Sequence, residues 1–204
     1  MTNMKLPAPT RSYQMTARAE AAEQTERNIL SAAVALWREH ALDDITLQMI
    51  AERAGVTVQT VIRRFESKDG VISAAIARDA SGIVAERHAA AAGDVAAGLK
   101  ALLAHYERDG DAVLRTLSVE DRFPIARTIA VEGRRVHRAA CAQVFAPYLP
   151  EPEHSDYERR LDTFVAATDI FVWKLLRRDL GRSAAHTQLV MRSLINGLIA
   201  ESQT

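Results

Sequence analysis

The chain has 204 residues, of which 48% are hydrophobic and 25% are charged, and its formal net charge is zero. This composition supports a large core, excludes an intrinsically disordered chain, and argues against a protein that coats nucleic acid nonspecifically. The single cysteine, Cys141, excludes an intramolecular disulfide, and we expect no metal site and no cofactor. The sequence has no apolar run as long as a membrane span and no signal-peptide core, which predicts a cytoplasmic protein.

Residues 1–23 contain two prolines, scattered charges and no clear hydrophobic period. They predict a flexible N-terminal arm. A helix follows, and four of its apolar residues share one face: Ile29, Ala33, Leu36 and Trp37.

Residues 46–68 predict two short helices joined by a tight turn. Thr46 is a good N-cap for the first helix, and Gly55 stands at its C-terminal end, where a left-handed residue ends a helix at little cost. Thr57 is the next N-cap, and Ser67 caps a further helix. A second helix held at a wide angle by a short glycine turn is the helix-turn-helix geometry that enters the major groove of DNA.

The second of these helices has two faces. We assign its inner face to the apolar residues Val58, Val61, Ile62 and Phe65. The polar residues face outward and are Gln59, Thr60, Arg63 and Arg64. Val58 has a second interpretation, because a valine at the edge of the groove could touch a thymine methyl group.

Residues 25–80 resemble the DNA-binding domain of the TetR family of transcriptional repressors. The match rests on the opening helix, on Thr46, on the segment IAERAGV that starts at Ile50, and on Thr57, Thr60, Arg63, Phe65, Ser67 and Lys68. The chain departs from the family at Ile62, where an aromatic residue is usual, and at Arg64, where histidine or tyrosine is common. The resemblance implies an all-α homodimer with a helix-turn-helix DNA-binding domain at residues 24–70 and a ligand-binding and dimerisation domain at residues 71–204.

Side-chain chemistry and this resemblance together assign contacts to a double-stranded DNA operator. Thr46 and Lys68 stand at helix N-termini, which suit a backbone phosphate. Gln59 could read adenine, and Arg63 or Arg64 could read guanine. The expected DNA-binding residues are Thr46, Thr57, Val58, Gln59, Thr60, Arg63, Arg64 and Lys68.

From residue 69 to the end of the chain the pattern stays helical, without a strand signal. Gly110 and Gly181 are each expected to end a helix, and Pro124 suits the first position of another. The expected helices cover, approximately, residues 71–88, 94–108, 111–117, 124–147, 156–180 and 183–202.

The last two helices carry the argument for dimerisation. Apolar side chains cover much of the final helix, which is more than one neighbouring helix can bury. Two such helices from each chain would form a four-helix interface, and packing within one chain is the alternative. A two-fold dimer spaces its recognition helices about one turn of DNA apart and predicts a palindromic operator. The expected interface residues are Phe164, Phe171, Leu175, Leu194 and Leu198.

Polar side chains on otherwise apolar helices are candidates for a ligand site. They are His105, Arg134, His137, Thr168, Asp169 and Trp173. Arg134 and His137 lie one turn apart and could hold an anionic ligand or belong to a solvated face. Asp169 could line a pocket or bridge a dimer interface. Cys141 could be a redox sensor, although the role of a small buried apolar residue is favoured.

With the resemblance, the sequence predicts a transcriptional regulator, expected to be a repressor, that a small-molecule ligand releases from its operator. We do not expect an enzyme, because the sequence lacks a Ser-His-Asp order in a strand-turn-helix context, a Gly-rich phosphate loop and an HExxH motif. Two alternatives remain: a helical ligand-binding protein that has lost DNA binding, and an all-α enzyme.

Overall fold

The computed structural model describes residues 11–88 and 90–201, and within these ranges the chain consists of helices and loops without a strand. The predicted all-α fold is confirmed. The helices of the N-terminal unit are α1 Arg11–Glu39, α2 Leu47–Ala54, α3 Val58–Phe65 and α4 Lys68–His88. The remaining elements are α5 Val95–Leu117, α6 Pro124–Val144, the short turn η1 Ala146–Tyr148, α7 Tyr157–Ala167, α8 Ile170–Lys174, the π-helical turn η2 Leu175–Asp179 and α9 Ala184–Glu201. None of the described helices is both long enough and apolar enough to cross a membrane.

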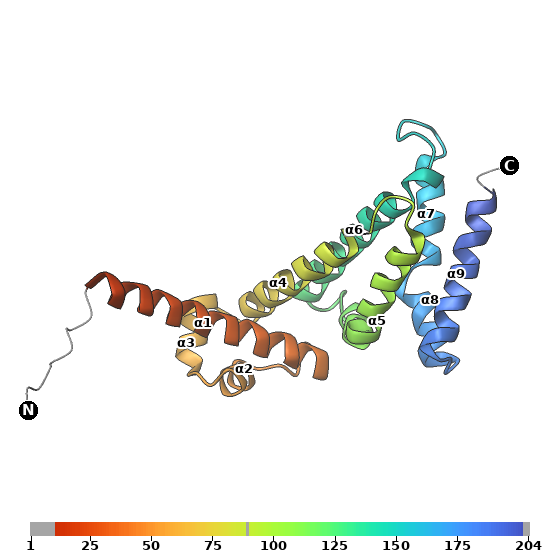
Figure 1. Cartoon of the computed structure of the whole chain (residues 1–204). Coiled ribbons are helices and arrows are strands. Elements are labelled where there is room, and N and C mark those ends of the chain that lie inside the picture. The colour runs from red at the N-terminus through yellow and green to blue at the C-terminus, as the bar shows by residue number, and fades with distance from the viewer. Residues whose placement is uncertain (1–10, 89, 202–204) are drawn as a thin grey trace, which may run out of the picture.

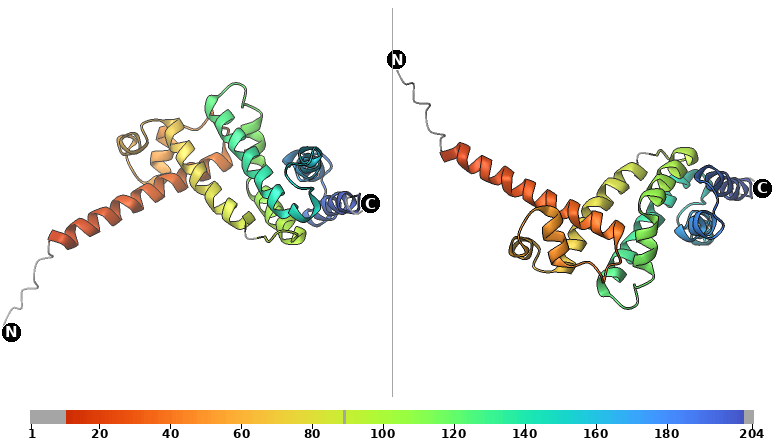
Figure 2. Two further views of the ribbon diagram at one scale, coloured as in Figure 1. Left: turned by 90° about the horizontal axis from the view of Figure 1, so that it is seen from above. Right: turned by 90° about the horizontal axis from the view of Figure 1, so that it is seen from below.

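The molecule is elongated, with α1 at one end and α9 at the other (Figure 1). Helix α4 connects the two halves, because it packs on α1 and α3 and also on α5 and α6. Helices α7 and α9 pack against each other beyond α5 and α6. Both views in Figure 2 place α2 and α3 far from α7 and α9. A signal between the two ends must therefore pass through α4, α5 or α6.

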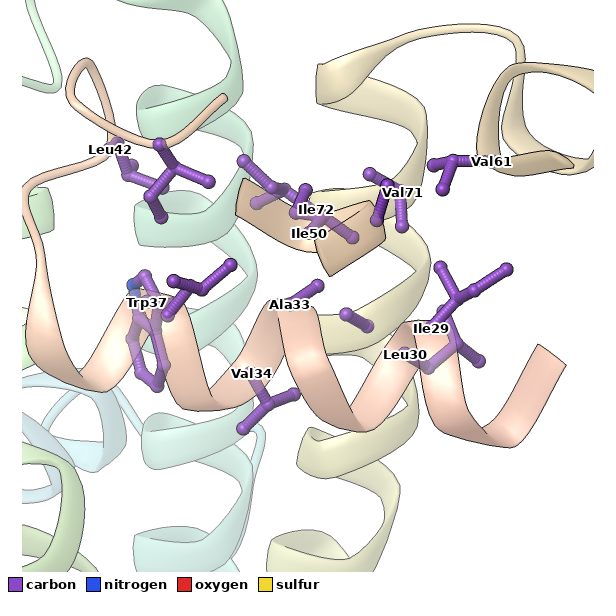
Figure 3. Packing of buried hydrophobic residues seen from close by; sticks show 14 of the residues in the cluster. Ile29, Leu30, Ala33, Val34, Trp37, Leu42, Ile50, Val61, Val71 and Ile72 are labelled. Atoms are coloured by element: carbon purple, nitrogen blue, oxygen red, sulfur yellow. The ribbon is translucent and has the colours of Figure 1, made fainter. Parts of the chain in front are cut away.

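The N-terminal unit has its own apolar core (Figure 3). The apolar face predicted for the opening helix is confirmed, because all four of its residues are buried: Ile29, Ala33, Leu36 and Trp37. Ile50 of α2, Val61 of α3 and Val71 of α4 close this core from the other side. The core therefore fixes the orientation of α3 relative to α1 and α4.

Helix α1 begins earlier than the sequence predicts. Residues 11–23 were expected to belong to a flexible arm, but they form the first turns of α1. The reason is the composition of this segment, which is rich in alanine, arginine and glutamate, all of which favour helix. Residues 1–10 of the expected arm lie outside the described residues.

Helix α5 runs through Gly110 without a break, so the prediction that a helix ends there is wrong. Gly110 has another role, because a Cβ added to it would lie 2.6 Å from the ring of Trp173. Trp173 belongs to a second apolar core, which also includes Leu103, Phe145, Phe164 and Ile195, and Trp173 and Phe164 are fully buried in it. Glycine at position 110 thus allows the indole of α8 to approach the backbone of α5.

The single helix predicted over residues 156–180 is also interrupted. Asp169 adopts an extended backbone conformation, and its side chain accepts a hydrogen bond from the N–H of Phe171, so that a new helix begins at Ile170. Aspartate is a strong N-cap, and this local bond competes with continuation of α7. The interruption separates the buried end of α7 from the more exposed surface of α8 and η2.

Candidate DNA-binding surface and internal cavity

The turn between α2 and α3 has the predicted geometry. The hydroxyl of Thr46 accepts a hydrogen bond from the N–H of Met49 at 3.2 Å and caps α2. Gly55 ends α2 in the left-handed region at φ 68°. The hydroxyl of Thr57 accepts from the N–H of Thr60 at 3.2 Å and caps α3. These caps satisfy backbone donors at both helix starts and hold the turn without the help of a ligand.

Helix α3 buries one side and exposes the other. Val61 is fully buried, and Val58 and Phe65 are partly buried against the same core. The prediction that Ile62 belongs to the inner face is wrong, because 42% of this residue is exposed. Ile62 stands three positions after Gln59, which places both on the outward side of the helix. Gln59, Ile62 and Arg63 are the exposed residues of α3, and we call them the outward row.

Two of the predicted DNA-binding cations make contacts within the chain. The guanidinium of Arg64 bonds to the carboxylate of Glu26 on α1 at 3.3 Å. The ammonium of Lys68 donates to the carbonyl of Leu42 at 3.0 Å. Arg63 forms no ion pair with the part of the chain that the structure describes, and it is exposed. Arg63 is therefore the arginine of α3 that is available for a partner.

A cavity of about 250 Å³ lies between α4, α5, α6 and the start of α8. Apolar side chains make up most of its wall, including Ile76, Val113, Ile129 and Phe171. Four of the six predicted ligand-binding residues line it: His105, Arg134, His137 and Asp169. The cavity is thus a largely apolar chamber with a few polar groups, which is the usual composition of a small-molecule site.

Arg134 and Asp169 have defined partners at this wall. Arg134 donates to the carboxylate of Glu120 at 2.5 Å, and this hydrogen bond raises the pKa of Arg134. The carboxylate of Asp169 accepts from the N–H of Phe171, as described above. Because Arg134 keeps its charge at any physiological pH, the cavity wall holds a permanent cation beside apolar surface.

The other two predicted ligand-binding residues do not line this cavity. Thr168 is buried behind it, where its hydroxyl donates to the carbonyl of Phe164 at 2.7 Å and lies 3.4 Å from the thiol of Cys141. Trp173 is fully buried and donates from Nε1 to the carboxylate of Glu107 at 2.8 Å. The prediction is wrong for Trp173, whose indole N–H is satisfied inside the second core, whereas Thr168 lines a separate small cavity together with His137 and Cys141. Cys141 is buried, as the favoured interpretation expected, but its neighbours there include polar groups.

An ion-pair network that the sequence analysis missed lies beside the cavity. Arg38 of α1 donates to Asp79 of α4 at 2.9 Å and to Asp109 of α5 at 2.6 Å. Asp109 also contacts Nδ1 of His105 at 3.1 Å and accepts from Arg108 at 2.9 Å. Asp79 and His105 both line the cavity. The network therefore joins the cavity wall to the C-terminal end of α1.

The electrostatics of Asp109 follow from these contacts. Burial alone would raise the pKa of Asp109, but the hydrogen bonds from His105 and Arg38 outweigh burial and lower it to about 2. The sequence carried a signal for this site, because Asp109 stands three positions from both Tyr106 and Ala112 on the buried face of α5. An acidic residue on such a face needs a buried partner.

A second set of bonds joins α5 to α1. Nε1 of Trp37 donates to the hydroxyl of Thr116 at 2.9 Å, and both residues line the cavity. Arg115 donates to the carbonyls of Trp37 and Arg38 at 3.2 and 2.7 Å. A cation at the C-terminal end of a helix is favourable, because the last carbonyls are unpaired and carry partial negative charge. Helix α1 is therefore anchored to α5 by both its side chains and its backbone.

Comparison with known protein families identifies the helices around the turn between α2 and α3. Residues 29–75 match the model of the bacterial regulatory proteins of the tetR family. Residues 29–75 therefore carry a DNA-binding domain of the tetR type. The match covers most of the N-terminal unit, and it agrees with the residues on which the sequence resemblance rests. The turn between α2 and α3 is thus the helix-turn-helix of this domain.

The fold of the whole chain has a counterpart among solved structures. A candidate transcriptional regulator from Pseudomonas aeruginosa PAO1 superposes with a TM-score of 0.67 and 16% sequence identity, over 87% of this chain and 91% of that one. This likeness shows that the fold is shared beyond the N-terminal unit. No curated protein matches the sequence of the chain.

The residues predicted for the dimer interface fall into two groups. Phe171, Leu175 and Leu194 are large apolar residues that are exposed, and Leu198 is half-buried. Phe164 is fully buried and stacks on Phe145 with ring centroids 4.2 Å apart, so its prediction as an interface residue is wrong. Leu180 and Leu189 extend the exposed apolar surface. We call Phe171, Leu175, Leu180, Leu189 and Leu194 the apolar face.

Proposed function

We propose that the chain is a TetR-family repressor that binds a palindromic operator as a homodimer and leaves it when a small molecule occupies the cavity. The proposal rests on the outward row of α3, a short helix that Thr57 caps. A helix whose one side is fixed in a core and whose other side presents Gln59 and Arg63 suits the major groove. A protein that acts on an operator works where the DNA is, so we also propose a cytoplasmic location in a bacterial cell.

Arg63 provides a sharp test of DNA binding. The full-length protein is used to select double-stranded DNA from a random pool, and affinity for the selected sequence is measured at several salt concentrations. We expect Arg63→Ala to lower affinity at least tenfold, because each good bidentate arginine–guanine contact contributes about 1–3 kcal/mol and the dimer makes two of them. Arg127→Ala is the matched control, because Arg127 is an exposed arginine of α6 outside the helix-turn-helix. Failure to select any DNA would instead favour a ligand-binding protein that has lost DNA binding.

Dimerisation is supported by the apolar face. Its residues belong to α8, η2, the loop that follows η2 and α9, and these elements lie at the end of the molecule opposite to α3 (Figure 1). Exposed apolar surface of this kind is typical of an interface between subunits. A two-fold axis near α8 and α9 would give the two α3 helices equivalent positions on two half-sites. Sedimentation analysis is expected to give twice the mass of one chain.

Release by a ligand is supported by the position of the cavity. Trp37 of α1 and Thr116 of α5 both line the cavity and bond to each other. Asp79 and His105 line it and bond to the pair formed by Arg38 and Asp109. A molecule that moves these side chains moves α1 relative to α5. We propose that this shift changes the spacing of the two α3 helices and lowers operator affinity.

The two tryptophans of the chain offer a direct assay for a ligand. Trp37 lines the cavity, whereas Trp173 is buried outside it. Small, mainly apolar molecules are screened for a change in tryptophan emission. A cavity ligand is expected to change the emission of the native chain and of Trp173→Phe, but not that of Trp37→Phe. The same molecule must release the selected DNA, and a binder that leaves DNA affinity unchanged would refute the proposed coupling.

A further inference from the structure

The outward row of α3 contains one apolar residue, and its position is informative. Ile62 stands one helical turn after Gln59 and immediately before Arg63, and 42% of it is exposed. The core of the N-terminal unit is closed by Val61 and Phe65, so Ile62 is not needed to fill it. An exposed branched side chain between Gln59 and Arg63 is placed to contact an apolar group of whatever these two polar residues bind.

The major groove of DNA offers one such group on standard bases. The C5-methyl of thymine is apolar, whereas the other base edges in this groove present hydrogen-bond donors and acceptors. We propose that Ile62 is a specificity-determining residue that selects a thymine in each half-site by contact with this methyl group. The proposal rests on the proposed function, because it requires α3 to enter the major groove.

Helix geometry limits where this thymine lies. Ile62 and Arg63 are adjacent, so they are displaced along the helix axis by about 1.5 Å. Successive bases of one strand are spaced by about 3.4 Å. Adjacent residues also differ by about 100° around the helix axis, so the two side chains reach base pairs within about two steps of each other. The selected operator is expected to contain a thymine within about two base pairs of the one that Arg63 reads.

Arg64 does not belong to the outward row, which reduces the number of side chains that can read a half-site. Its guanidinium bonds to Glu26 on α1, and only 22% of its side chain is exposed. The arginine that precedes it, Arg63, is exposed. A half-site is therefore read by an amide, a branched aliphatic chain and one guanidinium. With these three side chains, we expect a short half-site in which selectivity for thymine comes from an apolar contact and not from a hydrogen bond.

The test removes the methyl group from DNA and the side chain from the protein. The full-length protein first selects DNA from a random double-stranded pool. Each thymine of the selected half-site is then replaced in both half-sites by deoxyuridine, which lacks the C5-methyl and keeps the same pairing edge. For one thymine position we expect native affinity to fall about fourfold per half-site, the effect of exposing one methyl-sized apolar group. Ile62→Ala should bind the thymine and uracil operators equally.

Val131→Ala is the matched control, because Val131 is an exposed apolar residue of α6 outside the helix-turn-helix. It should keep the native preference for thymine. Circular dichroism establishes that Ile62→Ala is folded, as expected for alanine at an exposed helical position. The proposal is overturned if no uracil substitution weakens native binding, or if Ile62→Ala keeps the full penalty, in which case another residue reads the methyl. Failure to select any DNA overturns the proposed function and this inference together.

Discussion

Arg38 and Asp109 join the helix-turn-helix unit to the helices that form the cavity. Nε of Arg38 donates to Oδ1 of Asp109 across 2.6 Å, and the side chain of Asp109 has no exposed surface. Arg38 belongs to α1, which carries the core against which α3 packs, and Asp109 belongs to α5. The buried carboxylate of Asp109 also contacts His105 on the cavity wall. One network therefore contains both the cavity wall and the α1 helix of the helix-turn-helix unit.

The first prediction concerns the stability that this network contributes. Asp109→Asn should lower the free energy of unfolding by about 2 kcal/mol, because it leaves the guanidinium of Arg38 without its closest carboxylate. The effect is below that of a fully buried pair, since about a third of the Arg38 side chain is exposed. Urea unfolding measures the change. Asp121→Asn removes a fully solvated carboxylate and should change stability by less than about 0.5 kcal/mol; equal effects of the two variants would contradict the prediction.

The second prediction concerns pH. Asp109 has a pKa of about 2 in the folded chain, below its usual value of 3.8. The unfolded chain therefore binds a proton at higher pH than the folded chain does, so stability rises with pH in this window. The contribution of Asp109 is fully present above about pH 5 and falls by about 1 kcal/mol between pH 5 and pH 3. The difference in unfolding free energy between the native chain and Asp109→Asn should shrink by this amount. A difference that is constant from pH 5 to pH 3 would show that the pKa is not lowered.

The third prediction uses two glycines inside helices. Gly110→Ala should destabilise the chain by about 2 kcal/mol, because the new methyl would lie 2.6 Å from the ring of Trp173 in the second core. Gly82 is its matched control on α4, where an added Cβ meets nothing within 4 Å. Gly82→Ala should stabilise the helix by up to about 1 kcal/mol, since alanine has the higher helix propensity. Thermal unfolding of both variants measures the effects, and two shifts of the same sign would contradict the role assigned to Gly110.

The local elements of the N-terminal unit could be predicted from the sequence because their signals are local. Thr46, Gly55 and Thr57 stand at the positions that their side chains or backbone conformations require, and the structure confirms each of them. The orientation of Ile62 could not be predicted from its hydrophobicity. The neighbouring residue Val61 fills the core, and an adjacent residue on a helix points elsewhere.

Positions that depend on contacts between distant segments were harder to predict. Gly110 looks like a helix end until Trp173, 63 positions later, is seen to pack against it. Thr168 and Trp173 look like exposed polar groups on an apolar helix, but their hydrogen bonds to Phe164 and Glu107 satisfy them inside the core. The spacing within α5 indicates that Asp109 is buried, but it does not reveal Arg38 as the partner, because this contact depends on the packing of α1 on α5.

The fourth prediction concerns the apolar face and the proposed dimer. Leu194 is a large exposed apolar residue of α9, and Leu194→Glu would place a charge from each subunit in the proposed interface. Burial of an unpaired charge is costly, so this variant should sediment as a monomer and should lose the affinity that depends on two half-sites. Val131→Glu makes the same change on α6, at a residue that is 57% exposed and outside this face. It should remain a dimer with native operator affinity. If Leu194→Glu also stays dimeric while it folds normally by circular dichroism, the two-fold interface lies on another surface of the chain.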